Sequence, residues 1–109
     1  MVKRKIDAVI MESVNDYIEV IKQHYNLDAV YLFGSHAKGN THKSSDVDLA
    51  IVSNDIQNRH DDMVNLLVLA KDIEADIEPH PFKTEEFNEN GSSFVHEILR
   101  TGIPVYPNS

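Results

Sequence analysis

Two aspartates open an otherwise apolar segment of the chain, residues 46–52. A β-strand turns successive side chains to opposite faces, so Asp46 and Asp48 share one face while Val47, Leu49 and Ile51 occupy the other. Two carboxylates held so close repel each other, and a cation bound between them removes that conflict. Carboxylate pairs of this kind hold Mg²⁺ against the phosphates of a nucleotide. The segment therefore predicts a strand that carries a metal site on one face.

A glycine and a serine precede this strand by a ten-residue spacer and follow the apolar segment 29–33. Gly34 has no Cβ and lets an anion approach the backbone, while Ser35 adds a hydroxyl donor at the start of an expected helix, where free N–H groups favour phosphate. The pair alone is an ordinary strand-to-helix turn. Four cationic or partly cationic residues fall inside the spacer: His36, Lys38, His42 and Lys43. Together these features indicate a phosphate site beside the metal site.

The composition restricts the classes of protein to which the chain can belong. A length of 109 residues with 41% hydrophobic and 26% charged residues predicts one globular domain, residues 1–109. The formal net charge of -8 argues against nonspecific binding to nucleic acid. The absence of cysteine excludes disulfides and thiolate metal sites. No apolar run is long enough for a membrane span or a signal-peptide core, so we expect a cytoplasmic protein.

Periodicity and turn residues predict a mixed α/β chain, that is, helices packed on a small sheet. Helices are expected over residues 6–25, from Ser35, over 57–75, as a turn from Thr84, and over 94–101 up to Gly102. Strands are expected over residues 27–33, 46–52, 73–78 and 103–106. Asn26 is expected to end the first helix in a left-handed conformation. Pro79 and Pro81 are expected to stop the third strand, because proline has no N–H for a sheet ladder.

The helix over residues 57–75 has an apolar centre, residues 66–70, with little polar interruption. A helix that is apolar nearly all round is buried on more than one side. In a domain this small, we expect part of that surface to meet another chain, either a partner or a second copy.

The combination of strand, Gly34-Ser35, spacer and Asp46-x-Asp48 resembles the nucleotidyltransferase superfamily related to DNA polymerase β. The similarity is greatest to the minimal nucleotidyltransferases, which consist of little besides the catalytic core, and it covers residues 30–81. The resemblance implies a polymerase β palm-like fold with a small mixed sheet flanked by helices. It implies that Gly34, Ser35 and Lys38 hold the triphosphate of ATP or another NTP. It also implies a two-metal Mg²⁺ site at Asp46 and Asp48.

A third carboxylate on the neighbouring strand completes the site in such enzymes, as a metal ligand or a general base. Asp76 and Glu78 share a face by parity, and Glu74 has the same parity but lies nearer the preceding helix. Glu78 is preferred because two prolines fix the conformation of the segment that follows it. Asp76 stays the alternative, since the family most often uses aspartate. His80 either lines the same pocket or packs between those prolines.

Two positions depart from the family pattern. Many relatives place arginines shortly after Gly-Ser, where this chain has His36 and Lys38. Lysine supplies a point charge without the bidentate fork of arginine, and histidine is only partly charged near neutral pH. A weaker hold on the triphosphate is therefore expected.

The resemblance implies transfer of a nucleotide, AMP from ATP, to an acceptor hydroxyl. Relatives of this size commonly act as antitoxins beside a small helical toxin of the HEPN type, and some transfer AMP to it. Two alternatives stay open: an antitoxin that acts by contact alone, and a transferase of the aminoglycoside type with a small-molecule acceptor. A nucleic-acid polymerase is disfavoured by the acidic charge.

Overall fold

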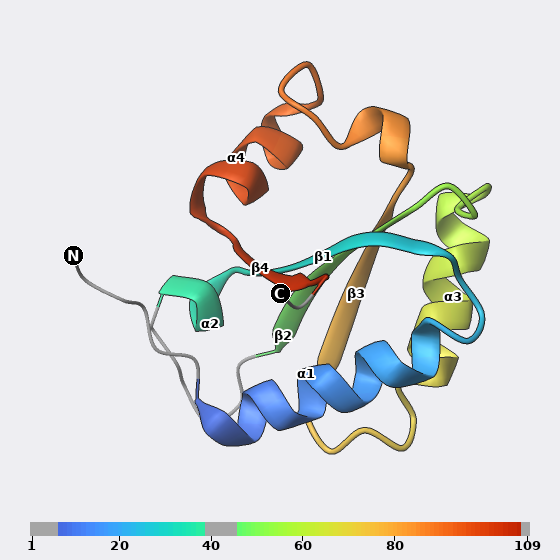
Figure 1. Ribbon diagram of the computed structural model, residues 1–109, viewed down its shortest axis with the longest axis vertical. Helices are drawn as coiled ribbons and strands as arrows, with labels where there is room; N and C mark the ends of the chain where they lie inside the picture. Colours follow the sequence, from blue (N-terminus) through green and yellow to red (C-terminus); the bar gives the residue numbers. More distant parts are fainter. Residues whose placement is uncertain (1–6, 39–45, 108–109) are drawn as a thin grey trace.

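The computed structural model describes residues 7–38 and 46–107, in which helices and strands follow one another along the chain (Figure 1). The helices are α1 (Ala8–Ile21), α2 (Ser35–Lys38), α3 (Arg59–Leu69), the short 3₁₀ helix η1 (Thr84–Glu86) and α4 (Ser93–Thr101). The strands are β1 (Leu27–Phe33), β2 (Val47–Ser53), β3 (Ile77–Phe82) and β4 (Ile103–Tyr106). Among the described residues, no helix is both long enough and apolar enough to cross a bilayer.

The strands form one four-stranded sheet in the order β3-β2-β1-β4. The central strand β1 pairs antiparallel with both β2 and β4, whereas β2 pairs parallel with β3. A parallel pair needs a crossover connection, and α3 supplies it here. The sheet is therefore mixed, as the sequence predicts.

Helices cover both faces of the sheet, α1 and α3 on one side and α4 on the other (Figure 1). The larger core, on the α1 and α3 side, includes Val14, Tyr17 and Ile21 of α1, Val30 and Leu32 of β1, Leu49 and Ile51 of β2, and Leu66 of α3. The smaller core, on the α4 side, contains Phe33, Ala50, Val52, Phe82, Val95 and Ile98. Even-numbered residues of β2 thus face α4, which places the side chain of Asp48 on that side.

Most predicted elements are confirmed with small changes in their bounds. Strand β1 coincides with the predicted 27–33, β4 with 103–106, and β2 lies one residue later than 46–52. A short helix does begin at Ser35, and a helical turn does begin at Thr84. Helix α4 begins one residue earlier than predicted and ends at Thr101, before Gly102.

The prediction that Pro79 and Pro81 stop the third strand is wrong. Strand β3 begins at Ile77 and contains both prolines. The Val47 N–H donates to the Asp76 carbonyl at 2.8 Å, so the even-numbered residues of this segment turn their peptide groups towards β2. The odd-numbered prolines then turn their missing N–H towards the free edge of the sheet, where it breaks no ladder hydrogen bond.

Two predicted helices are longer than the observed ones. Helix α1 ends at Ile21, and successive backbone turns carry the chain to β1. Asn26 is not left-handed, since no described residue other than glycine has a positive φ; its N–H instead donates to Asp55 Oδ2 at 2.7 Å. Helix α3 ends at Leu69, and the segment 73–76 that was assigned to a strand lies outside the sheet.

The two helices on the larger core are joined by a buried hydrogen bond. The Tyr17 hydroxyl donates to the Leu66 carbonyl at 2.8 Å. This carbonyl lies in the last turn of α3, where backbone acceptors lack an intrahelical partner. Burial raises the pKa of Tyr17 well above its usual range, so the hydroxyl stays a donor. Leu66 is the only buried residue of α3, so the predicted burial of this helix on several sides is not found within one chain.

A carboxylate near the start of α3 joins this helix to the segment between α1 and β1. Asp62 accepts a hydrogen bond from the Tyr25 hydroxyl at 2.8 Å and from the backbone N–H groups of Gln57 and Asn58 at 2.9 and 3.2 Å. Burial opposes ionisation of Asp62, but these hydrogen bonds outweigh it and lower the pKa below its ordinary 3.8. A carboxyl whose pKa falls on folding stabilises the fold above its unfolded pKa, and this contribution is lost as the pH drops through the folded pKa.

We expect Asp62→Asn to lower the free energy of unfolding by about 1–2 kcal/mol at neutral pH, because one amide replaces an ionised acceptor of three donors. The difference from the parent should shrink as the pH falls below the ordinary 3.8 of the carboxyl. Urea denaturation followed by circular dichroism at a series of pH values measures it. Asp61→Asn, at an exposed neighbouring carboxyl, is the matched control. A difference that stays constant with pH would refute this role of the charge.

Candidate active site

The register between β2 and β3 brings together carboxylates that are distant in sequence. Asp48 pairs with Glu78, and Ala50 with His80, so the Glu78 and His80 side chains share the face of Asp48. Nε2 of His80 lies 3.2 Å from Oδ1 of Asp48 and 3.7 Å from Oε1 of Glu78. One ligand atom from each of these residues lies within 4.8 Å of the other two. We call Asp48, Glu78 and His80 the β2–β3 cluster.

Asp46 lies just before β2, and its side chain is exposed. A hydrogen bond with Asp46 is the main cause that raises the pKa of Glu78, and burial and the charge of Asp48 act in the same direction. His80 opposes this shift. Three carboxyl groups therefore meet at one end of the sheet, and their mutual repulsion is the conflict that a bound cation relieves.

Gly34 makes room for the carboxylate of Asp48. It follows β1, whose last residue, Phe33, is the register partner of Asp48, and it has a φ of 78°. A Cβ at Gly34 would lie 2.4 Å from Oδ2 of Asp48. Position 34 thus excludes a side chain for two reasons, the left-handed backbone and the closeness of the Asp48 carboxylate. Ser35 follows Gly34 directly and begins α2.

Other predicted site residues are placed less centrally. Asp76 is exposed, precedes β3 and contributes its carbonyl to the sheet, and its carboxyl does not belong to the β2–β3 cluster. Of the two candidate third acids, the structure therefore brings Glu78 to Asp48. Lys38 is the last residue of α2, and His36 is buried within the same helix. The predicted cations His42 and Lys43 lie outside the described residues.

Two aromatic rings pack against His80. The sequence predicted only that this histidine lines the pocket or packs between prolines. Phe33 and Phe94 present their rings to the imidazole at centroid distances of 5.1 and 5.9 Å, both edge-on. Phe33 and Phe94 also contact each other at 5.5 Å. The imidazole thus packs against these rings as well as facing the carboxylates. Phe94 comes from α4, far along the chain from Phe33.

A groove that no sequence pattern predicted begins at His80. A small pocket of about 90 Å³ is lined by Arg59, Met63, His80, Pro81, Phe82 and Phe94. A second, of about 270 Å³, shares Arg59, Phe82 and Phe94 and adds Glu86, Ser92 and Val95. A third, of about 600 Å³, shares Arg59 and Glu86 and adds Ile56, Gln57, Lys83 and Glu85. We call these three pockets together the Arg59 groove.

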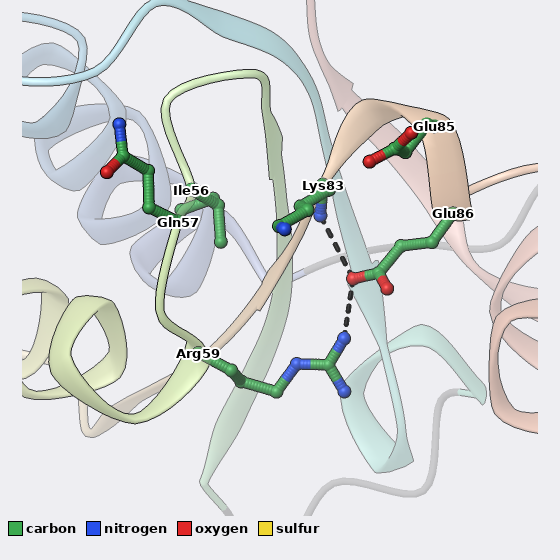
Figure 2. Close-up of a pocket in the computed structure, with 6 residues that line it drawn as sticks. All are labelled: Ile56, Gln57, Arg59, Lys83, Glu85 and Glu86. Atoms are coloured by element: carbon green, nitrogen blue, oxygen red, sulfur yellow. Dashed lines mark hydrogen bonds and ion pairs between the residues drawn. The ribbon is translucent and has the colours of Figure 1, made fainter.

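Arg59 forms the centre of this groove. Figure 2 shows its side chain extending from the start of α3 towards Glu86 of η1. The guanidinium is 2.5 Å from Oε1 of Glu86, which also accepts from the Lys83 N–H at 3.0 Å. The same guanidinium lies 5.5 Å from the centroid of the Phe82 ring. The groove therefore combines aromatic surface with a charge pair and begins at a residue of the β2–β3 cluster.

Comparison with known proteins identifies the family. Residues 15–109 match the family described as polymerase beta, nucleotidyltransferase. The chain belongs to this nucleotidyltransferase family. The resemblance found in the sequence, the mixed fold and the assignment to the transferases are therefore confirmed. A comparison with curated proteins gives no match.

Solved structures share the fold of this nucleotidyltransferase. A proposed nucleotidyltransferase from Sulfolobus solfataricus has 22% identity and a TM-score of 0.58, over 75% of this chain and 79% of that one. A toxin–antitoxin structure with AMP-PNP has 19% identity and a TM-score of 0.57, over 88% and 72%. A mutant of the toxin–antitoxin pair MntA–HpeT has 18% identity and a TM-score of 0.56, over 84% and 71%. All three show that the fold is shared.

We expect Gly34→Ala to destabilise the nucleotidyltransferase by about 1–3 kcal/mol, because alanine pays for a left-handed backbone and its Cβ displaces the Asp48 carboxylate. The two causes separate in a double-mutant cycle with Asp48→Ala, which removes the carboxylate but leaves the backbone strain. The cost of Gly34→Ala, measured by urea denaturation, should be smaller in the Asp48→Ala background. An equal cost in both backgrounds would show that the carboxylate plays no part.

Proposed function

We propose that this chain transfers AMP from ATP to a hydroxyl group of a partner protein and depends on a divalent cation, Mg²⁺ in the simplest case. The observation that carries the proposal is the register of β2 with β3, which sets Asp48 opposite Glu78 and beside Gly34. In the proposed site the carboxylates bind the cation, and the backbone that starts α2 after Gly34 binds the phosphates. The phosphates of a nucleotide bind both to a cation held by carboxylates and to the protein backbone.

The chemistry of the side chains fits a divalent cation. Asp48 and Glu78 supply oxygen ligands on one face, Asp46 lies next to Glu78, and the Gly34 position leaves the Asp48 carboxylate uncovered by a side chain. In the proposed reaction Asp46, Asp48 and Glu78 hold the cation, while Gly34, Ser35 and Lys38 hold the triphosphate. Asp76 keeps the role of an alternative third acid that would require movement of the chain before β3.

The proposed step is an in-line displacement at phosphorus. The acceptor oxygen forms a bond to the α-phosphorus, and the bond from that phosphorus to the oxygen bridging to the β-phosphate breaks. Pyrophosphate leaves with the electron pair of the broken bond. The proton of the acceptor hydroxyl passes to a carboxylate of the site, for which Glu78, the third acid beside Asp48, is assigned. A bound cation would neutralise the negative charge of the phosphates.

Two similarities support ATP and a protein partner. A structure of the same fold is a toxin–antitoxin complex with AMP-PNP, an analogue of ATP, and another is the MntA–HpeT pair. Helix α3 also leaves an apolar face open: Val64, Leu67 and Val68 are 46%, 45% and 56% exposed. Their spacing puts them on one side of the helix. We propose that a small helical toxin of the HEPN type covers this face, with a second copy of the chain as the alternative occupant.

The Arg59 groove is the proposed approach of the acceptor. It begins at His80 of the β2–β3 cluster and is lined by aromatic rings, which suit the ring of an acceptor tyrosine. Met63 and Arg59 lie one and two turns before Leu67 on α3, so the groove and the open face follow the same helix. A partner seated on the open face would reach the groove with a neighbouring segment.

Transfer from ATP labelled at the α-phosphate tests the activity. We expect label to appear on the helical partner protein in the presence of Mg²⁺ or Mn²⁺. Asp46→Asn and Asp48→Asn should each lower the rate by about a hundredfold or more, since a lost metal ligand removes several kcal/mol of charge stabilisation. Asp72→Asn, at an exposed aspartate in the connection after α3, should leave the rate unchanged.

Two other outcomes would change the functional assignment. Tight binding of the partner without metal-dependent labelling of any protein would favour an antitoxin that acts by contact. Labelling of aminoglycosides in place of protein would favour the small-molecule transferase.

Truncation of Phe94 tests the acceptor groove. Phe94 is 45% exposed, so its removal should spare the core. We expect Phe94→Ala to raise the KM for the acceptor protein by about tenfold, because an aromatic contact contributes about 1 kcal/mol or more, and to leave the KM for ATP nearly unchanged. Val9→Ala, at a residue that is 65% exposed on α1, is the control. Equal effects on both KM values would exclude a groove specific to the acceptor.

A further inference from the structure

His80 has the position of a metal ligand. Its Nε2 atom faces two carboxylate oxygens, at 3.2 Å from Asp48 and 3.7 Å from Glu78. Two ligand atoms that each lie about 2.1 Å from one cation are at most about 4.2 Å apart, so both separations are compatible with a shared ion. The imidazole is the only nitrogen ligand in the β2–β3 cluster.

The surroundings of His80 hold its ring in this direction. Phe33 and Phe94 contact it edge-on, and the side chain is 23% exposed. Strand β3 fixes the backbone, since Pro79 and Pro81 flank His80 and each restricts its own φ. A ring packed in this way loses little conformational entropy when it binds an ion, and such preorganisation favours binding.

The chemistry of imidazole then bears on which cation binds. Mg²⁺ takes oxygen ligands almost exclusively and keeps several waters. Imidazole nitrogen suits Fe²⁺, Ni²⁺ and Zn²⁺. Mn²⁺ prefers oxygen ligands but, as a transition metal, accepts an imidazole nitrogen more readily than Mg²⁺ does. Two carboxylates with one imidazole therefore make a better site for a transition metal than for Mg²⁺.

We propose that His80 is a direct ligand of the cation and shifts the preference of this site from Mg²⁺ to Mn²⁺ or a similar transition metal. The assignment rests on the proposed function only in placing the cation at the same carboxylates. The competing role for His80 is that of a hydrogen-bond donor, which would position Asp48 and Glu78 around an ion that it never touches. The two roles differ in whether the imidazole nitrogen is bound to the metal.

A spectroscopic measurement on the parent protein separates these roles without a mutation. Mn²⁺ is added to the tag-free chain at mildly alkaline pH, and electron spin-echo modulation is recorded. We expect modulation from a directly coordinated imidazole nitrogen. Its absence from a protein that binds Mn²⁺ would overturn the assignment.

Binding measurements with variants give the second test. Affinities for Mg²⁺ and Mn²⁺ are measured by competition with a chromophoric chelator, again without nucleotide. His80→Asn keeps a hydrogen-bond donor but is a poor ligand for transition metals, so we expect the ratio of Mn²⁺ to Mg²⁺ affinity to fall about tenfold or more. His24→Asn, at an exposed histidine, should leave the ratio unchanged, and Asp48→Asn should weaken both ions.

An unchanged ratio in His80→Asn would overturn the assignment, as would a parent protein that prefers Mg²⁺. Because no transfer is measured, failure of the proposed AMP transfer leaves these results intact. Conversely, AMP transfer with an unchanged metal ratio would keep the proposed function and remove His80 from the metal.

Discussion

Parallel pairing of β2 with β3 is the interaction on which the candidate site depends. Asp48 and Glu78 are thirty residues apart, and the observed register puts their carboxylates side by side on one face. A slip by one residue would turn Glu78 towards α1 and α3. The crossover helix α3 connects β2 to β3. Hydrogen bonds of the Tyr17 hydroxyl and the Asp62 carboxylate, both outside the site, fix the position of that helix. Contacts outside the candidate site thus determine where its carboxylates lie.

The same register creates an electrostatic cost within the fold. It brings Asp48 and Glu78 together next to Asp46, and the pKa of Glu78 is raised by its hydrogen bond with Asp46, by burial and by the charge of Asp48. Gly34 permits this arrangement, because a side chain at that position would collide with the Asp48 carboxylate. A cation that binds only the folded state would offset this cost by mass action. Stability and ligand binding are therefore coupled in this protein through one group of carboxylates.

The fold was largely predictable because its strands and helices carry strong local patterns. Strand β1 matches its apolar run, and the spacing of Gly34 and Asp48 is a local signal as well. Parity did not decide between Asp76 and Glu78, since both share a face, and the preference for Glu78 came only from the prolines that follow it; the register distinguishes the two positions. Pro79 and Pro81 misled the prediction because their effect depends on β3 being an edge strand, which is a property of the whole sheet.

Helix α3 connects the features that sequence patterns could not relate to one another. Leu66 points into the core, whereas Val64, Leu67 and Val68 remain open. The apolar centre of this helix was expected to be buried on several sides, and one chain supplies only one of them. The first turns of the same helix line the groove that begins at His80. A partner that covers the open apolar face would therefore bury surface and be positioned beside the β2–β3 cluster by the same contact. In such an arrangement, binding of the partner would also bring its acceptor group to the β2–β3 cluster.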